Sequence, residues 1–128
     1  MSARRSRALR VAQSTVRVLL IASFLMAAFG KFTSAPEAVA MFDALGLGLW
    51  LMYVTGAMEL TGALLLAMRR TRLLGVALLS CVLIGATASH LGPVPGNPLV
   101  PATMLVLLLL ASGGEVRGLS LKRAGAVA

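Results

Sequence analysis

Long apolar runs that carry few charges are the feature that most limits how this chain can fold. Of its 128 residues, 59% are hydrophobic and only 12% are charged, and the mean hydropathy is +0.93. A soluble domain carries about 25% charged residues, so this chain has too little polar surface to stay dissolved in water. We therefore expect an integral membrane protein that is surrounded by the lipid bilayer. A chain of this length holds about four spans of roughly 20 residues each.

Four apolar stretches agree with that estimate. Membrane helices are expected over residues 16–32, 47–68, 73–91 and 99–112. The sequence thus predicts an all-α fold, an integral membrane four-helix bundle. Its parts are a basic arm over residues 1–15, the four-span bundle over 16–112 and a basic tail over 113–128.

Two connecting segments carry their own signals. Pro36 suits the first turn of a helix, and glycines follow at positions 46 and 48, so a short interfacial helix is expected over residues 37–44. The loop over residues 92–98 contains three prolines and cannot be helical. The span after it is short for a hydrocarbon core of about 30 Å, so this loop is expected to dip towards the membrane interior.

The basic residues indicate how the bundle is oriented. The net charge is +8, and eleven of the twelve Lys and Arg residues lie in residues 1–17, in the tail and in the turn at residues 69–72. Cytoplasmic loops carry such an excess, so we expect both termini to be cytoplasmic and the protein to lie in the cell inner membrane. No aromatic residues are interleaved with the basic clusters, and nucleic acid is therefore excluded as a partner.

A single carboxylate stands within an apolar run. Glu59 is the one charged residue between Leu47 and Met68. A carboxylate at membrane depth is costly unless it is paired or protonated. The sequence therefore indicates that a neighbouring helix supplies a partner for Glu59.

Lys31 and His90 stand near the ends of their expected spans. With a rise of about 1.5 Å per residue above the cytoplasmic arginines, Glu59, Lys31 and His90 lie at about 15, 21 and 27 Å. A lysine side chain can bridge such steps, so Lys31 is expected to pair with Glu59 and to hydrogen-bond towards His90. We predict that the three line one pocket that opens to the outside. Thr55 shares a helix face with Glu59 and Thr87 precedes His90 by three residues, so both threonines join the predicted ligand-binding or proton-relay residues.

Each of these residues also has a structural interpretation. Lys31 could reach the outer interface as an anchor at the end of its span. His90 could bond a loop carbonyl, and Glu59 could hydrogen-bond between helices while neutral. The threonines could hold helices together.

Other chemistry is poorly supported. No catalytic residue is assigned, and no metal site is expected, because one histidine and one mid-span carboxylate fall short of the usual ligand number. Cys81 is the one cysteine, so the chain has no dithiol of its own, and Cys81 is expected to be a small core residue.

Three motifs occur in order along the spans. They are Phe29-Gly30-Lys31, Gly56-Ala57-Met58-Glu59-Leu60-Thr61-Gly62-Ala63-Leu64-Leu65-Leu66 and Ala86-Thr87-Ala88-Ser89-His90. Together they resemble the DoxX/DoxD-like family of small four-helix membrane proteins, over roughly residues 17–113. The resemblance implies a compact bundle, with Lys31, Glu59 and His90 at the positions where the family pattern carries Lys, Glu and His. It also implies a link to redox systems such as thiosulfate:quinone oxidoreductase subunits, while relatives in the wider superfamily act as assembly factors.

Two functions follow as expectations. The first is a membrane subunit or partner of a redox system, whose outward-facing pocket binds a quinone or another small ligand. The alternative is a non-catalytic scaffold or assembly factor, in which the polar trio is an internal clamp and small faces such as Ser23/Ala27 and Gly56/Gly62 dock a partner. No self-contained catalytic motif makes the chain an enzyme by itself. A membrane redox partner or a homodimer is the expected protein partner, and no covalently bound cofactor is expected.

Overall fold

The structure, a computed structural model, describes residues 3–113 and 123–125. Every regular element among the described residues is a helix and none is a strand, which confirms the predicted all-α class. The helices are α1 (Ala3–Phe32), α2 (Pro36–Leu45), α3 (Trp50–Ala67), α4 (Arg72–Leu91) and α5 (Leu99–Ala111). The tail predicted over residues 113–128 lies almost entirely outside the described residues.

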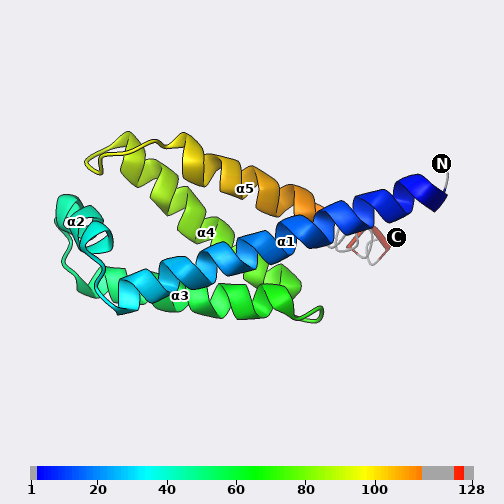
Figure 1. Cartoon of the computed structure of the whole chain (residues 1–128), viewed down its shortest axis with the longest axis horizontal. Helices are drawn as coiled ribbons and strands as arrows, with labels where there is room; N and C mark the ends of the chain where they lie inside the picture. Colours follow the sequence, from blue (N-terminus) through cyan, green and yellow to red (C-terminus); the bar gives the residue numbers. More distant parts are fainter. Residues whose placement is uncertain (1–2, 114–122, 126–128) are drawn as a thin grey trace.

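Four of these helices form a bundle, and α2 covers one end of it (Figure 1). α3 packs against α1 and α4, and α5 closes the bundle by packing against α4 and α1. Helices α1, α3 and α4 are long and apolar enough to cross a membrane, whereas α5 is a shorter apolar helix of 13 residues. The protein is therefore an all-helical membrane protein with three long apolar helices.

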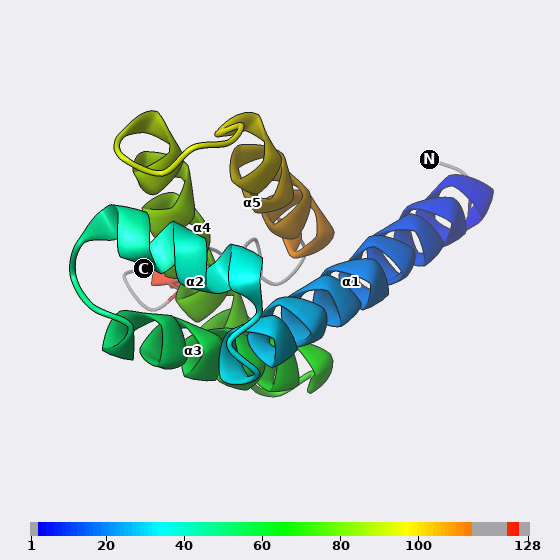
Figure 2. The same cartoon turned by 60° about the vertical axis from the view of Figure 1, so that its left-hand side comes forward.

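The basic N-terminal segment is part of α1. The helix is continuous for 30 residues, without a break where the predicted arm and the first span were expected to meet. Its first half extends past the rest of the bundle (Figure 2). Its side chains reach α5 where the bundle begins, since Gln13 Nε2 and Arg17 donate to the carbonyls of Leu110 and Ala111 at 3.1 and 2.9 Å.

The bundle has two chemically different ends. The basic half of α1 and the arginine-containing turn between α3 and α4 lie at one end, where α5 also finishes (Figure 1). Helix α2 and the loop over residues 92–98 lie at the other end. This separation is the one that the charge pattern predicts, with basic loops gathered on one side.

Helix α2 confirms the predicted short helix. Pro36 stands in its first turn, and Gly46 ends it with a left-handed backbone at φ 69°. Phe42 is buried beneath α2. The proline-containing loop also turns inward, since Val94 is only 2% exposed and its amide donates to the Ser89 carbonyl at 3.0 Å.

Helices α3 and α4 approach each other most closely near the turn that joins them. A Cβ added to Gly75 would lie 2.6 Å from the backbone nitrogen of Leu66 and 2.8 Å from the carbonyl oxygen of Gly62. A Cβ added to Gly62 would meet Leu79, a fully buried core residue, at 2.6 Å. Small residues permit such close packing of helices in lipid. The face formed by Gly56 and Gly62 is thus buried inside the bundle, and the expectation that it docks a partner is wrong.

Candidate functional site

An ion pair joins the end of α1 to the middle of α3. Lys31 Nζ lies 3.0 Å from Glu59 Oε1 and 2.9 Å from Glu59 Oε2, so the ammonium group contacts both carboxylate oxygens. Glu59 is buried and 5% exposed. The predicted pairing of Lys31 with Glu59 is therefore present in the structure.

Gly56 allows this pair to form. It lies on the α3 face that carries Glu59, and a Cβ added there would come within 3.2 Å of Lys31 Cβ and 3.5 Å of Phe32 Cζ. The missing side chain leaves room for the last turn of α1 to approach α3. This role of Gly56 was not predicted from the sequence, although the three-residue spacing from Gly56 to Glu59 was a usable signal.

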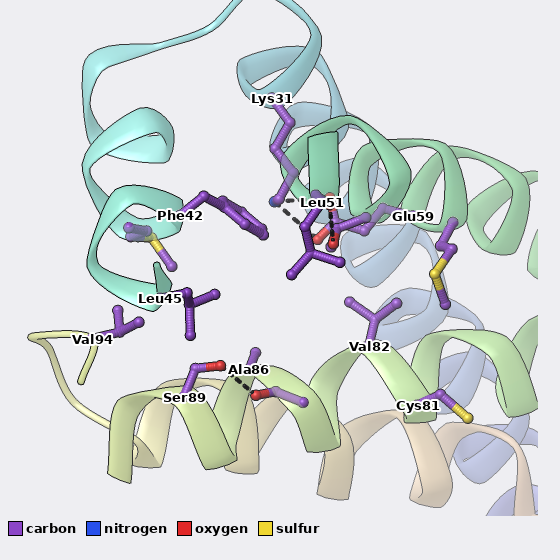
Figure 3. A pocket seen from close by; sticks show the side chains of 14 residues that line it. Lys31, Phe42, Leu45, Leu51, Glu59, Cys81, Val82, Ala86, Ser89 and Val94 are labelled. Carbon is purple, nitrogen blue, oxygen red and sulfur yellow. Dashed lines mark hydrogen bonds and ion pairs between the residues drawn. The ribbon is translucent and has the colours of Figure 1, made fainter. Parts of the chain in front are cut away.

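The ion pair forms one wall of a cavity of about 270 Å³ (Figure 3). The cavity is bounded by the end of α1, by α2, by the first half of α3, by the second half of α4 and by the proline-containing loop. Its lining residues are Lys31, Met41, Phe42, Leu45, Leu51, Thr55, Met58, Glu59, Cys81, Val82, Gly85, Ala86, Ser89 and Val94. A cavity of this size is near the lower limit for pockets that hold small organic ligands.

Polar groups in this cavity are few. Thr55 Oγ1 donates to the Leu51 carbonyl and Ser89 Oγ donates to the Gly85 carbonyl, each at 2.8 Å within its own helix. An ammonium group has three N–H donors, and Lys31 gives two contacts to Glu59, which leaves one donor for a ligand. The site therefore combines one strong polar anchor with walls that are mostly apolar, because the two hydroxyl groups are bonded within their own helices.

The structure brings together only part of the predicted residue set. Lys31, Glu59 and Thr55 line the cavity, but Thr87 and His90 are not among its lining residues. Thr87 donates from Oγ1 to the Leu83 carbonyl at 2.8 Å. Thr87 directly follows the lining residue Ala86, and His90 directly follows the lining residue Ser89. Because one step along a helix turns a side chain by about 100°, the side chains of Thr87 and His90 point away from the cavity.

His90 instead packs against the proline-containing loop. A Cβ added to Gly96 would lie 3.0 Å from His90 Cε1 and 3.0 Å from His90 Nδ1. The Nδ1 atom is buried and has no hydrogen-bond partner. The imidazole ring is thus a packing element beneath the loop that also carries Val94 to the cavity.

Gly96 gives a test of how firmly this loop is held. The substitution Gly96→Ala places a methyl group on the His90 ring and forces an L residue to adopt φ 130°, so it should destabilise the protein by about 1–3 kcal/mol. Gly30→Ala is the matched control, since Gly30 lies in the helical backbone of α1 and a Cβ there meets only an ordinary contact with Ala35 Cβ at 3.8 Å. Thermal unfolding in detergent would give the melting temperatures of both variants. Equal melting temperatures would contradict the packing of Gly96 against the His90 ring.

Metal binding has no support from the described part of the chain, where no three His, Cys, Asp or Glu residues gather. Cys81 is exposed on α4, so the expectation that it is a core residue is wrong. Figure 3 shows its sulfur directed away from the centre of the cavity.

The covering residues of the cavity were missed from the sequence. Met41, Phe42 and Leu45 of α2 and Val94 of the loop all line it. Spacings of three and four residues place the α2 residues on one face of a short helix, and this was the available signal. Depth along a helix cannot reveal such a cover, because the covering segments lie between the spans.

The chain matches a known protein family over most of its length. The model of a DoxX-like family matches residues 15–113, a range that includes every cavity-lining residue. Neither the curated proteins nor the solved structures gave a match.

Proposed function

The chain belongs to the DoxX-like family, and from that premise we propose that this small membrane protein binds a mostly apolar ligand that carries an oxygen-containing head group. The observation that supports the proposal most directly is the Lys31–Glu59 pair on the wall of an otherwise apolar cavity. A ligand carbonyl or hydroxyl can accept the remaining Lys31 N–H while its apolar part contacts α2, α3 and α4.

A quinone-like molecule fits this combination of groups. Its carbonyl oxygen would accept a hydrogen bond from Lys31, and Glu59 would supply or accept a proton as the ligand is reduced or oxidised. The electrons would come from a membrane redox partner, since reduction of a quinone to a quinol takes up two electrons and two protons. In this proposal the chain is the ligand-binding member of a redox system, and the described residues contain no electron-transfer group.

The charge distribution supports a definite orientation. We infer that α5 is the fourth span and that both termini are cytoplasmic, because the basic half of α1 and the arginines of the α3–α4 turn share one end. The cavity, α2 and the proline-containing loop then belong to the outer half of the bundle.

Ligand binding tests the proposal. A decyl-tailed benzoquinone should bind the detergent-solubilised protein, and Glu59→Gln should weaken binding about tenfold, because the loss of the carboxylate releases Lys31 from its position. Glu37→Gln is the matched control, since Glu37 is exposed on α2 and does not line the cavity. Titration of the intrinsic Trp50 fluorescence, checked by equilibrium dialysis, would give both affinities. Equal binding by the wild type and Glu59→Gln would contradict the proposed role of the pair.

The clamp function remains the second candidate, because the same ion pair ties the end of α1 to α3. In that case the protein would act as a non-catalytic scaffold or assembly factor. It would bind no quinone, and the substitutions at Lys31 and Glu59 would change only the stability of the bundle.

A further inference from the structure

The cavity-lining residues differ in their exposure. Cys81 and Gly85, both near the middle of α4, are the exposed members of the set. Phe42 of α2 and Val94 of the loop are buried and cover the outer end. The open side of the cavity is therefore the seam between α3 and α4, and its outer end is closed.

The geometry of the two helices explains this opening. Gly62 and Gly75 hold α3 and α4 together near their connecting turn, and the helices separate towards α2 (Figure 1). At Gly85 the separation is large enough that an added Cβ meets no atom within 4 Å. Met58, a flexible side chain, stands on the α3 side of the same seam.

The opening lies at the depth of the hydrocarbon. Cys81 and Gly85 follow Arg72 by nine and thirteen residues, which places them about 14 and 20 Å along α4. The hydrocarbon core is about 30 Å thick, so a seam at these depths faces lipid chains rather than water.

We propose that the cavity opens sideways into the bilayer between α3 and α4, and that its ligand is an amphiphile dissolved in the membrane. The polar head of the ligand reaches the Lys31–Glu59 pair, and its apolar tail lies in the seam beside Gly85 and Met58. This inference rests on the proposed function in that it takes the cavity to be a ligand site. It replaces the outward opening expected from the sequence with access from the lipid.

The polarity of the site agrees with this route. A ligand from the aqueous side would have to displace α2 and the loop that carries Val94, which are packed over the outer end. A ligand from the bilayer meets only apolar or small side chains before the ion pair. The arrangement selects molecules with a single oxygen-bearing head and a thin apolar tail.

Reagent access to one engineered thiol tests the route without a ligand. Ala86→Cys in a Cys81→Ala background places the single thiol inside the cavity. In phospholipid vesicles, N-phenylmaleimide, which dissolves in the bilayer, should label this thiol, and the charged methanethiosulfonate MTSES should not. Adding Gly85→Leu should slow labelling by N-phenylmaleimide about tenfold by filling the seam. Ala77→Leu, an exposed position of α4 that does not line the cavity, should leave the rate unchanged.

Three results would overturn the proposal. They are rapid labelling by MTSES, an unchanged rate in Gly85→Leu, and resistance of the folded protein to both reagents. Met58→Trp narrows the seam from α3 and serves as the second variant where Gly85→Leu does not fold. Quinone binding is measured separately, so normal labelling with no quinone binding refutes the proposed function and leaves the lateral opening in place. Quinone binding with MTSES access refutes the lateral opening alone.

Discussion

Replacing Lys31 by methionine is expected to lower the free energy of unfolding by about 3–5 kcal/mol, because Glu59 would remain buried without a cation. Both carboxylate oxygens contact Lys31 Nζ in the structure, and Glu59 is only 5% exposed. Without Lys31, the buried carboxyl group of Glu59 has neither water nor a protein donor to replace the hydration that it loses on folding. Unfolding in mixed detergent micelles, followed by circular dichroism, would measure the change.

A double-mutant cycle separates the pair from its surroundings. The variant Lys31→Met/Glu59→Met removes both charges and leaves neither unpaired. Its loss of unfolding free energy should therefore be smaller than the sum of the two single losses by about 2 kcal/mol or more. Glu37→Met, at an exposed acid of α2, should change stability by no more than about 0.5 kcal/mol. Additive single effects would show that the contact between the two groups does not stabilise the bundle.

Much of the fold could be predicted because its signals are local. Apolar runs, Pro36 and Gly46 fix where α2, α3, α4 and α5 begin and end to within a few residues. The start of α1 at Ala3 was not predicted, because a cluster of arginines indicates charge and not a helix boundary. Neither was the burial of Gly62 against Leu79, since small residues at an interface do not reveal whether the partner helix belongs to the same chain.

The candidate site could be predicted from the sequence only in part. A buried acid needs a partner, and Lys31 was the one cation at a suitable depth, so their pairing followed from energetics. His90 was assigned to the same group by depth and by the family resemblance, but its position on α4 turns it towards Gly96 of the loop. The cover formed by Phe42 and Val94 depends on how two connecting segments fold back, and the order of the spans does not determine this.

Placing a leucine at Gly75 is expected to prevent the native packing of α3 against α4. An added Cβ there would meet three backbone atoms of α3 at 2.6, 2.8 and 3.0 Å, and backbone cannot rotate away as a side chain can. Overpacking of this kind typically costs about 1–3 kcal/mol for small additions, so a full leucine side chain should exceed about 3 kcal/mol.

The matched control lies on the same helix. Gly85→Leu adds the same side chain where no atom lies within 4 Å, and it should leave the melting temperature in detergent close to that of the wild type. The melting temperature of Gly62→Ala should lie between those of Gly75→Leu and Gly85→Leu, because its new methyl group meets the movable side chain of Leu79. The order Gly75→Leu, Gly62→Ala, Gly85→Leu from most to least destabilised follows from which atoms each substitution meets. A wild-type melting temperature for Gly75→Leu would mean that α3 and α4 are not held at the close separation on which the shape of the seam depends.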